Sequence, residues 1–394
     1  MVFLFDAVKN SLIMKKFLII SILILLLTAL SAFNSHNQST SGMETVQEMV
    51  ANNSVGYNLG CSFDGSEQMR EESPGFWMDY EYGDNLPLAT RELMQFLANG
   101  GITMVRIGVM WTEHVDFDTY EIRKDWMDRV QEVVDYVVDA GMYCLLCFWG
   151  DQGSQRDNLN WLCVDADKYP VTSFRYKTVW KQVAERFKDY GPLLLFDAFN
   201  EIVDSQTHFD NTSDENYETL NRLLQDFVDV VRATGGNNRY RNLALSVYSG
   251  QSNREHFFQK FKMPEDLTPN HLFISHHLYA EDFQIFDETV AANDIGLTIE
   301  LLNKYFVQKG IPCVGGEFGG LLGMQPQPVS EPERAKYYGF LVREAAQFGI
   351  PCLAWDDVTD FTDRYYLKWT SQMCVDSMLV NAPKKGRANW NKAK

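Results

Sequence analysis

The sequence predicts a (β/α)8 TIM barrel of the α/β class, built as a single domain. Eight short runs of apolar and β-branched residues follow one another along the chain, and each has the length of a buried strand. Amphipathic helical patterns separate most of these runs, and strands joined through helices pair in parallel. The chain has 394 residues, which is enough for a barrel of roughly 250 residues or more.

The expected strands lie at 55–59, 103–109, 143–148, 193–199, 243–247, 272–276, 312–315 and 352–355. The expected helices lie at 89–99, 124–140, 173–190, 214–233, 292–309 and 331–348. Gly141 and Gly191 directly follow two of these helices, where a left-handed cap favours glycine. An open, doubly wound sheet is the structural alternative, but no Gly-x-Gly-x-x-Gly motif follows the first strand to suggest a dinucleotide site.

The first fifty residues differ from the rest of the chain. Lys15 and Lys16 precede an apolar run at 17–30 and the small residues Ser31 and Ala32, which is the order of an export signal. We expect residues 1–33 to be an export signal or membrane anchor, with Met14 as a second candidate start. We expect a polar tether at 34–50, the barrel at 51–378 and a basic tail at 379–394. The protein is then secreted or held in the cell envelope, periplasmic or at the cell surface, and meets the membrane only through its N-terminal segment.

The charge and the cysteines exclude several classes of function. A net charge of -18 and a pI near 4.8 argue against nucleic acid, because phosphate binding needs clustered Lys and Arg. The seven cysteines are an odd number, so most are expected to be buried thiols rather than disulfides. Cys144 and Cys147 resemble a metal knuckle, but residues three apart on a strand point to opposite faces. No metal or organic cofactor is expected.

Two glutamates follow strands whose carboxyl ends meet at one opening. The fourth strand runs into Asn200 and Glu201, and the seventh delivers Glu317; in a parallel barrel such positions converge on the mouth. Two carboxyl groups there suit glycoside hydrolysis, in which one protonates the leaving oxygen and the other captures or stabilises an oxocarbenium-like centre. Because nearby like charges resist double ionisation, one of the pair should have a raised pKa and act as the acid. A strand-end glutamate that only caps a loop or pairs with arginine is the alternative.

At these residues the sequence resembles family 5 glycoside hydrolases, a family with its acid/base on strand four and its nucleophile on strand seven. The resemblance covers roughly residues 55–360 and rests on Tyr57-Asn58-Leu59-Gly60, Met104-Val105-Arg106-Ile107, Trp111 and His114, Phe199-Asn200-Glu201 and Gly316-Glu317-Phe318-Gly319. The stretches 126–130 and 232–237 also look like the endoglucanase and xyloglucanase branch often called subfamily 4.

The resemblance implies that Glu201 is the acid/base and Glu317 the nucleophile of a retaining O-glycosyl hydrolase. The implied activity is that of a cellulase-like endo-β-1,4-glucanase, which cleaves cellulose, xyloglucan or mixed-linkage glucan by double displacement. Arg106 would keep the nucleophile ionised, His277 would lie near the acid/base, and the Tyr279 hydroxyl would contact the nucleophile. The implied substrate-binding set is Asn58, Arg106, His114, Asn200, His277, Tyr279 and Trp355, with Trp355 as the platform under the sugar.

Three departures from the family pattern bear on substrate preference. Trp149 stands where a histidine is usual, Cys61 replaces an asparagine, and Asp356-Asp357 replaces an aspartate-asparagine pair. We expect altered substrate preference or reduced turnover, and Trp149 is itself a candidate to stack on a sugar. The aromatic residues Trp77, Tyr80, Tyr82 and Trp161 either line an extended cleft or pack in the core.

Three other functions remain possible from the sequence alone. A β-mannanase or β-glucosidase of the same family would use the same two carboxylates. A surface glycan-binding protein with weakened catalysis would keep the barrel and lose turnover, a reading that the missing histidine favours. In each case the expected partner is a glycan, chiefly a β-glucan, and the protein is expected to be a monomer.

Overall fold

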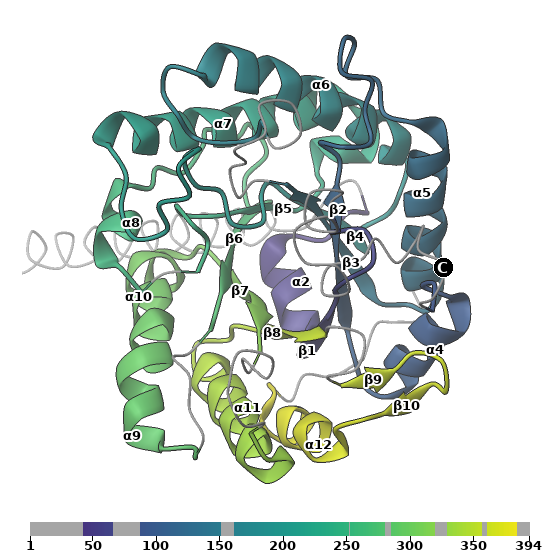
Figure 1. Ribbon diagram of the computed structural model, residues 1–394, viewed down its shortest axis with the longest axis vertical. Helices are drawn as coiled ribbons and strands as arrows, with labels where there is room; N and C mark the ends of the chain where they lie inside the picture. The colour runs from purple at the N-terminus through teal and green to yellow at the C-terminus, as the bar shows by residue number, and fades with distance from the viewer. Residues whose placement is uncertain are drawn as a thin grey trace, which may run out of the picture.

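The computed structural model describes residues 42–65, 87–150, 161–251, 253–279, 285–319, 329–356 and 361–383. Its main feature is a closed barrel in which β1 to β8 pair in sequence order and β8 pairs back to β1. Each of these pairings is parallel. Figure 1 shows the strands at the centre and the helices around them. The predicted (β/α)8 barrel is confirmed.

All eight predicted strands form, with ends shifted by a few residues. They are β1 (Val55–Leu59), β2 (Met104–Met110), β3 (Tyr143–Trp149), β4 (Leu194–Asp197), β5 (Leu243–Leu245), β6 (Leu272–His277), β7 (Cys313–Phe318) and β8 (Cys352–Asp356). β7 is longer than predicted and carries Glu317 within the strand. A small antiparallel hairpin of β9 (Thr362–Asp363) and β10 (Lys368–Trp369) follows β8 and was not predicted.

The predicted helices also form. They are α4 (Arg91–Asn99), α5 (Lys124–Asp139), α6 (Tyr169–Phe187), α7 (Asp214–Ala233), α10 (Leu297–Tyr305) and α11 (Glu331–Ala346). The elements that were not predicted are mostly short: α2 (Val46–Asn52), the 3-10 turn η1 (Gly236–Arg239), α8 (Glu255–Lys260), α9 (Glu288–Ala291) and α12 (Gln372–Asn381). The range predicted as one helix at 292–309 is split into a π turn η2 (Ala292–Gly296), α10 and a 3-10 turn η3 (Val307–Lys309).

The two predicted glycine caps had different outcomes. Gly141 is left-handed, with φ at +78°. Gly191 does not have a positive φ, so that prediction was wrong. The reason is that α6 already ends at Phe187, with Lys188 as a right-handed C-cap. Arg241 then donates to the carbonyl oxygens of Phe187 and Tyr190.

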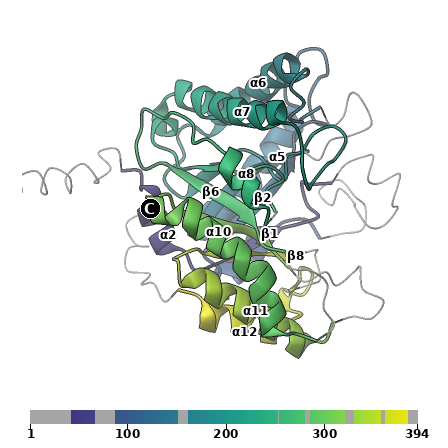
Figure 2. The same ribbon diagram turned by 90° about the vertical axis from the view of Figure 1, so that its left-hand side faces the viewer.

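Helix α2 closes the amino-terminal end of the barrel. Its N-cap Thr45 forms a capping box with Glu48, and Val46, Met49 and Val50 pack against apolar side chains inside the barrel. In Figure 1 α2 overlies the centre of the barrel, and Figure 2 shows it at one end of the strands. The tether predicted at 34–50 is therefore wrong for residues 46–50, because an apolar face with helical spacing is buried there.

The carboxyl-terminal boundary and the leader had different outcomes. α12 continues to Asn381, three residues past the predicted barrel end, because Cys374, Val375 and Met378 are buried in the core that surrounds the strands.

Within the described ranges no helix is long and apolar enough to cross a membrane. The expected export signal at 1–33 lies outside the described residues. All seven cysteines lie among the described residues; they are buried and none forms a disulfide, as expected.

Candidate active site

The barrel interior changes from apolar to polar along its strands. Near the amino ends of the strands, and against α2, the inward side chains form an apolar layer of Met104, Tyr143, Leu145, Leu193, Leu195, Ala244, Phe273, Val314 and Leu353. Nearer the carboxyl ends, the inward positions carry polar side chains: Asn58, Arg106, Cys147, Asp197, His277 and Glu317. The apolar layer keeps water away from the base of this polar group, which strengthens the electrostatic interactions within it.

Arg106 lies at the centre of the polar group, fully buried on β2. A guanidinium has five N–H bonds, and the structure supplies one acceptor for each. The acceptors, with their distances, are Asp197 Oδ2 on Nε (2.9 Å), Asn58 Oδ1 (3.3 Å) and Glu317 Oε1 (2.5 Å) on Nη1, and Cys147 Sγ (3.0 Å) and Asn200 Oδ1 (3.1 Å) on Nη2. Arg106 therefore cannot turn without breaking several contacts at once.

Glu317 is held by three side chains, and two of these contacts were implied by the resemblance. Its Oε1 accepts from Arg106, and its Oε2 accepts from the Tyr279 hydroxyl at 3.0 Å. Nδ1 of His277 lies 3.4 Å from the same Oε2. The register of β7 against β8 shifts between Gly315 and Phe318, and such irregularities change the direction of a side chain next to a site.

Glu201 faces the same space from the segment after β4. Its Oε1 lies 2.8 Å from Nδ1 of His277, so the imidazole lies between the two glutamates. Carboxylate oxygens of Glu201 and Glu317 and a ring nitrogen of His277 all lie within 4.8 Å of one another. The two side chains predicted from distant parts of the sequence therefore meet at one opening.

Burial sets the protonation of the central groups. It raises the pKa of Glu317 above that of an ordinary glutamate; His277, when protonated, and Arg106 oppose this shift, and Glu201 adds to it. Burial lowers the pKa of His277 to about 4, although the charge of Glu317 opposes this, so the imidazole is neutral near neutral pH. The sequence predicted a raised pKa for the acid of the pair. In the structure the pKa of Glu317, the predicted nucleophile, is raised, chiefly by burial, so Arg106 only partly has the role that the resemblance implied.

Trp149 and Trp355 stack across the barrel mouth. Their ring centroids are 5.6 Å apart and their planes meet at 24°. Two glycines make room for the rings: a Cβ on Gly108 would lie 2.5 Å from the Trp149 ring, and one on Gly60 would lie 2.8 Å from the Trp355 ring. Trp149 is only 6% exposed, whereas Trp355 is half-buried. Trp149 therefore supports the platform that was predicted for Trp355.

The two asparagines of the predicted site are placed differently. Nδ2 of Asn58 donates to the carbonyl oxygens of Gly316 and Leu353, so this side chain braces β1 against β7 and β8. Asn200 accepts from Arg106 through Oδ1. Because a guanidinium only donates, this contact turns the NH2 group of Asn200 away from Arg106.

Three predictions concern aromatic and polar residues that the structure places elsewhere. Among the described residues, the His114 ring stacks on Trp126, with centroids 3.6 Å apart, which indicates a packing role. Trp161 is buried in the outer core beside Phe148, so the cleft role considered for it is wrong. Asp356 points away from the barrel interior and bonds Tyr57 and Thr362, so it does not line the sugar site. Trp77, Tyr80, Tyr82 and Asp357 lie outside the described residues.

Two residues of the polar group were missed by sequence reasoning. Asp197 and Cys147 both contact Arg106. A signal for Asp197 was present, because it ends an otherwise apolar strand and a buried carboxylate needs a partner. Cys147 gave no such signal, since a buried cysteine is usually a small apolar residue.

The trio of Glu201, His277 and Glu317 also has the spacing of a possible metal site. Its oxygen and nitrogen atoms already contact one another, Arg106 and Tyr279. The permanent cation of Arg106 is bound to one of the carboxylates and would repel a second cation. The donor set therefore fits a pair of catalytic carboxylates better than a metal centre.

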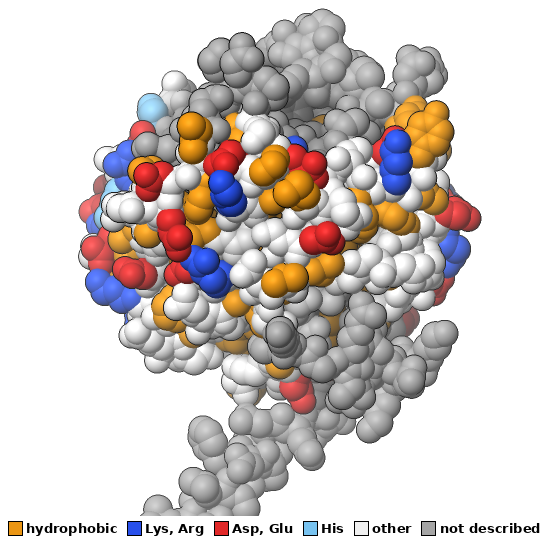
Figure 3. All heavy atoms as spheres, turned by 90° about the horizontal axis from the view of Figure 1, so that it is seen from below, with side chains coloured by type: hydrophobic (Ala, Val, Ile, Leu, Met, Phe, Trp, Pro, Cys, Tyr) orange, Lys and Arg blue, Asp and Glu red, His pale blue; other side chains and the backbone are white. Residues whose placement is uncertain are grey.

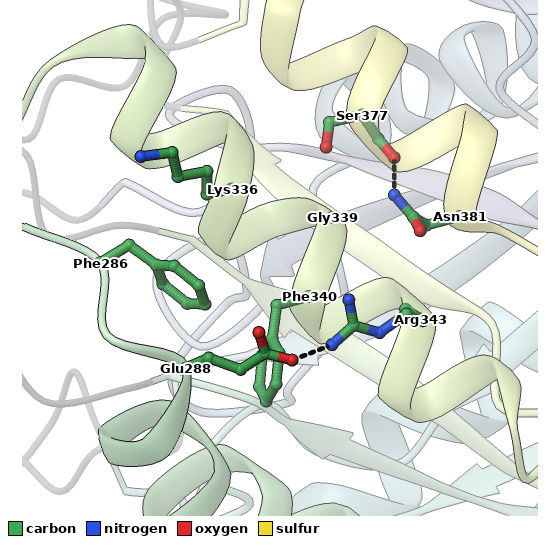
Figure 4. Close-up of a pocket in the computed structure, with 8 residues that line it drawn as sticks. All are labelled: Phe286, Glu288, Lys336, Gly339, Phe340, Arg343, Ser377 and Asn381. Atoms are coloured by element: carbon green, nitrogen blue, oxygen red, sulfur yellow. Dashed lines mark hydrogen bonds and ion pairs between the residues drawn. The ribbon is translucent and has the colours of Figure 1, made fainter.

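A separate hollow of about 500 Å³ lies outside the barrel. It is lined by Phe286, Glu288, Lys336, Gly339, Phe340, Arg343, Ser377 and Asn381 (Figure 4). Glu288 pairs with Arg343 at 2.5 Å, and Asn381 donates to the Ser377 carbonyl oxygen at 2.8 Å. We assign no ligand to this hollow, because Glu288 pairs with Arg343 and Asn381 with Ser377. Figure 3 shows acidic, basic and hydrophobic side chains interspersed on the face that it presents.

Comparison with known proteins identifies the family. The family model described as cellulase, glycosyl hydrolase family 5, matches residues 61–359. The chain belongs to glycosyl hydrolase family 5. Endoglucanase A of Ruminococcus albus is 30% identical over 365 residues, which cover 87% of this chain and 93% of that protein. A xyloglucan-specific endo-beta-1,4-glucanase of Bacteroides ovatus is 30% identical over 313 residues, 73% of this chain and 60% of that protein.

Solved structures of the family match most of this chain. A family 5 enzyme from Prevotella bryantii matches with a TM-score of 0.77 and 29% identity, over 87% of this chain and 99% of that one. A GH5-4 broad specificity endoglucanase from Ruminococcus champanellensis with bound cellotriose matches with a TM-score of 0.75 and 26% identity, over 86% of this chain and 100% of that one. These matches support the resemblance to subfamily 4 that was noted in the sequence.

Proposed function

We propose that this family 5 protein is a retaining endo-β-1,4-glucanase that cleaves β-glucan by double displacement. The observation that carries the proposal is the spacing of the carboxylates: oxygens of Glu201 and Glu317 lie within 4.8 Å of each other. Retaining glycosidases hold the two carboxyl groups roughly 5 Å apart, whereas inverting ones need about 6.5–9.5 Å to admit a water molecule.

In the first step a carboxylate oxygen of Glu317 attacks the anomeric carbon and the glycosidic C–O bond breaks. Protonated Glu201 gives its proton to the departing oxygen, so the leaving chain departs as a neutral alcohol and Glu201 becomes a carboxylate. In the second step Glu201 takes a proton from water, the water oxygen attacks the anomeric carbon, and the bond to Glu317 breaks. Two inversions restore the original β configuration, and both glutamates return to their starting state.

The surrounding side chains prepare these two groups. Arg106 and Tyr279 orient the two oxygens of Glu317, and the neutral imidazole of His277 contacts Glu201. The NH2 group of Asn200 can donate to a sugar hydroxyl, an interaction that gains strength in the transition state. Trp355 and its support Trp149 offer an aromatic face to the apolar face of a pyranose ring.

The proposed substrates are cellulose, xyloglucan and mixed-linkage glucan. This choice is supported by relatives named endoglucanase and xyloglucan-specific endo-beta-1,4-glucanase. The reading as a glycan-binding protein without catalysis is not favoured, because Glu201, Glu317 and their partners are all in place. The mannanase and β-glucosidase readings lack support from the relatives described above.

We further propose that the protein acts as a monomer outside the cytoplasm, secreted or held at the cell envelope. The support is the order of Lys15 and Lys16, the apolar run at 17–30 and the small residues Ser31 and Ala32, together with a polymeric substrate that does not cross membranes. Cell fractionation and N-terminal sequencing of the mature protein test this. Protein found only in the cytosol with residues 1–33 intact would contradict it.

One experiment tests the activity and its stereochemistry. Purified protein is incubated with xyloglucan, barley glucan, carboxymethyl cellulose and mannan, and the anomer released is followed by NMR at early times. We expect internal cleavage of glucans and a β-anomer that appears before mutarotation. An initial α-anomer, or cleavage of mannan alone, would contradict the proposal.

A further inference from the structure

Asp197 is a buried acid that the proposed reaction does not use directly. It is the last residue of β4 and has no exposed surface. Its Oδ2 accepts from Nε of Arg106 at 2.9 Å, and both side chains are fully buried. A buried carboxylate without a function is costly, so the pairing with the central arginine needs an explanation.

Arg106 carries one positive charge between two carboxylates. Asp197 binds Nε and Glu317 binds Nη1 of the same guanidinium. Burial raises the pKa of Asp197, and Arg106 lowers it; the same two influences act on Glu317. The more of the arginine charge Asp197 balances, the less remains to stabilise ionised Glu317.

We propose that Asp197 is a positioning residue that acts through Arg106: it fixes the plane of the guanidinium and limits how strongly Arg106 stabilises the nucleophile. The inference rests on the proposed role of Glu317. Such a limit favours catalysis, because a nucleophile becomes less reactive as its basicity falls. With Asp197 present, Arg106 orients Glu317 without making it a weak nucleophile.

The other groups that face Glu317 do not replace Asp197 in this role. They are Glu201 from the segment after β4, His277 on β6 and Tyr279 after β6. The imidazole is neutral near neutral pH, and a tyrosine hydroxyl donates without carrying charge. Cys147 contacts Arg106 through its sulfur, and its hydrogen bond to Asp197 lowers the pKa of that carboxyl group, so it helps to keep Asp197 ionised. Among these groups Asp197 is the anion that shares the cation with Glu317.

The test is Asp197→Asn, which keeps the size of the side chain and an oxygen that can accept from Nε. With the negative charge removed, more of the arginine charge acts on Glu317. The acid limb of the kcat/KM profile should therefore move to lower pH by about 0.5 to 1 unit, and kcat at the optimum should fall. A side chain that only holds the fold together would lower activity without this shift. An acid limb that stays in place or moves to higher pH would overturn the proposal.

A matched control is Asp266→Asn. The side chain of Asp266 is only 5% exposed and pairs with Arg232 through Nε and Nη2, with the Nη2 contact at 2.7 Å. Its loss should lower Tm and leave the acid limb in place; an equal shift in this variant would overturn the proposal. If Asp197→Asn does not fold, Asp197→Glu serves instead, because it keeps the charge. That variant should keep the wild-type acid limb with a lower kcat, and a shift of about 0.5 unit or more would contradict the inference.

The titration of Glu317 can also be followed without turnover. Protein labelled with 13C at the glutamate δ carbons gives a carboxyl signal for Glu317, assigned by its loss in Glu317→Gln. Its midpoint should be lower in Asp197→Asn than in the wild type, and equal midpoints would overturn the proposal. Wild-type protein that is inert on every glucan would contradict the proposed function, yet this titration would still test the coupling between Asp197, Arg106 and Glu317.

Discussion

Trp149 on β3 lies against Trp355 on β8, with 5.6 Å between the ring centroids. The contact depends on the absence of side chains at Gly108 and Gly60, which lie under the two rings. A histidine at position 149 would place a polar side chain beside the sugar. The tryptophan that stands there instead places an apolar ring against Trp355. The departure at position 149 therefore changes the support of the sugar platform and leaves the two glutamates untouched.

Trp149→Ala is expected to weaken glucan binding. The substitution removes the stacked face beneath Trp355, and an aromatic pair contributes about 0.5–1.5 kcal/mol beyond its buried area. We expect kcat/KM on a chromogenic cello-oligosaccharide to fall by roughly 2- to 13-fold, mainly through KM. Trp149→Phe keeps an aromatic face and should lose much less. Equal kcat/KM values for the parent and the alanine variant would show that the stack does not matter.

Much of the fold could be predicted because the barrel strands are short, mostly apolar runs, and amphipathic helical patterns separate most of them. α7 formed with the predicted bounds, and α5 differed only at its last residue. α2, α8 and the β9–β10 hairpin were missed because such short elements give little periodicity, and their burial depends on a barrel that is already formed. Gly191 shows the same limit, since tertiary contacts of Arg241 end α6 earlier than the glycine suggested.

The site was predictable where strand ends supplied polar residues. Glu201, Glu317, Arg106, His277 and Tyr279 meet as expected. Asp197 was missed because its partner comes from another strand, and only the closed barrel shows that it shares Arg106 with the nucleophile. The direction of the pKa shift at Glu317 also depended on burial, which a single sequence does not give.

Glu317→Gln is expected to abolish turnover and to preserve the fold. The amide cannot form the glycosyl intermediate, so kcat should fall by at least about 1,000-fold. Because burial raises the pKa of Glu317, its charged form opposes folding, and Tm near neutral pH should not decrease. A variant that keeps one tenth of the activity would remove Glu317 from the mechanism.

Glu201→Ala tests the other carboxylate. On substrates with good leaving groups the glycosyl-enzyme should still form, but its hydrolysis should be slow. Added azide should restore turnover, with a β-glycosyl azide as product. The small anion attacks without a general base, so it replaces the second step only. An α-glycosyl azide from this variant would mean that Glu201 is the nucleophile and Glu317 the acid/base.

Arg106→Lys is expected to move the acid limb of kcat/KM to higher pH. The nucleophile must be ionised, so activity is lost as the pH falls through the pKa of Glu317, which burial has already raised. Arg106 lowers that pKa through a short contact with Oε1, and a lysine cannot serve Asp197 and Glu317 together. The shift is therefore opposite in sign to that expected for Asp197→Asn. An acid limb displaced to lower pH would contradict this assignment.

Arg241→Met is expected to destabilise the fold without touching the site. Arg241 is fully buried, and it donates to Asn238 Oδ1 and to the carbonyl oxygens of Phe187, Tyr190, Gly191 and Leu194. Methionine fills a similar volume but leaves these buried acceptors without a donor, at a cost of about 3–5 kcal/mol. Thermal unfolding should show a Tm lower by several degrees, on the scale of about 1–2 °C per kcal/mol for a domain of this size.

The matched control for Arg241 is Arg239→Met, two residues earlier in the same turn. Arg239 is exposed, so its replacement should change stability by less than about 0.5 kcal/mol. Equal Tm values for the two variants would mean that the contacts of Arg241 with the end of α6 do not stabilise the barrel. The carbonyl oxygens of Phe187 and Tyr190 lie in the connection between α6 and β4. A lower Tm for Arg241→Met alone would therefore show that the contacts of Arg241 with this connection stabilise the fold.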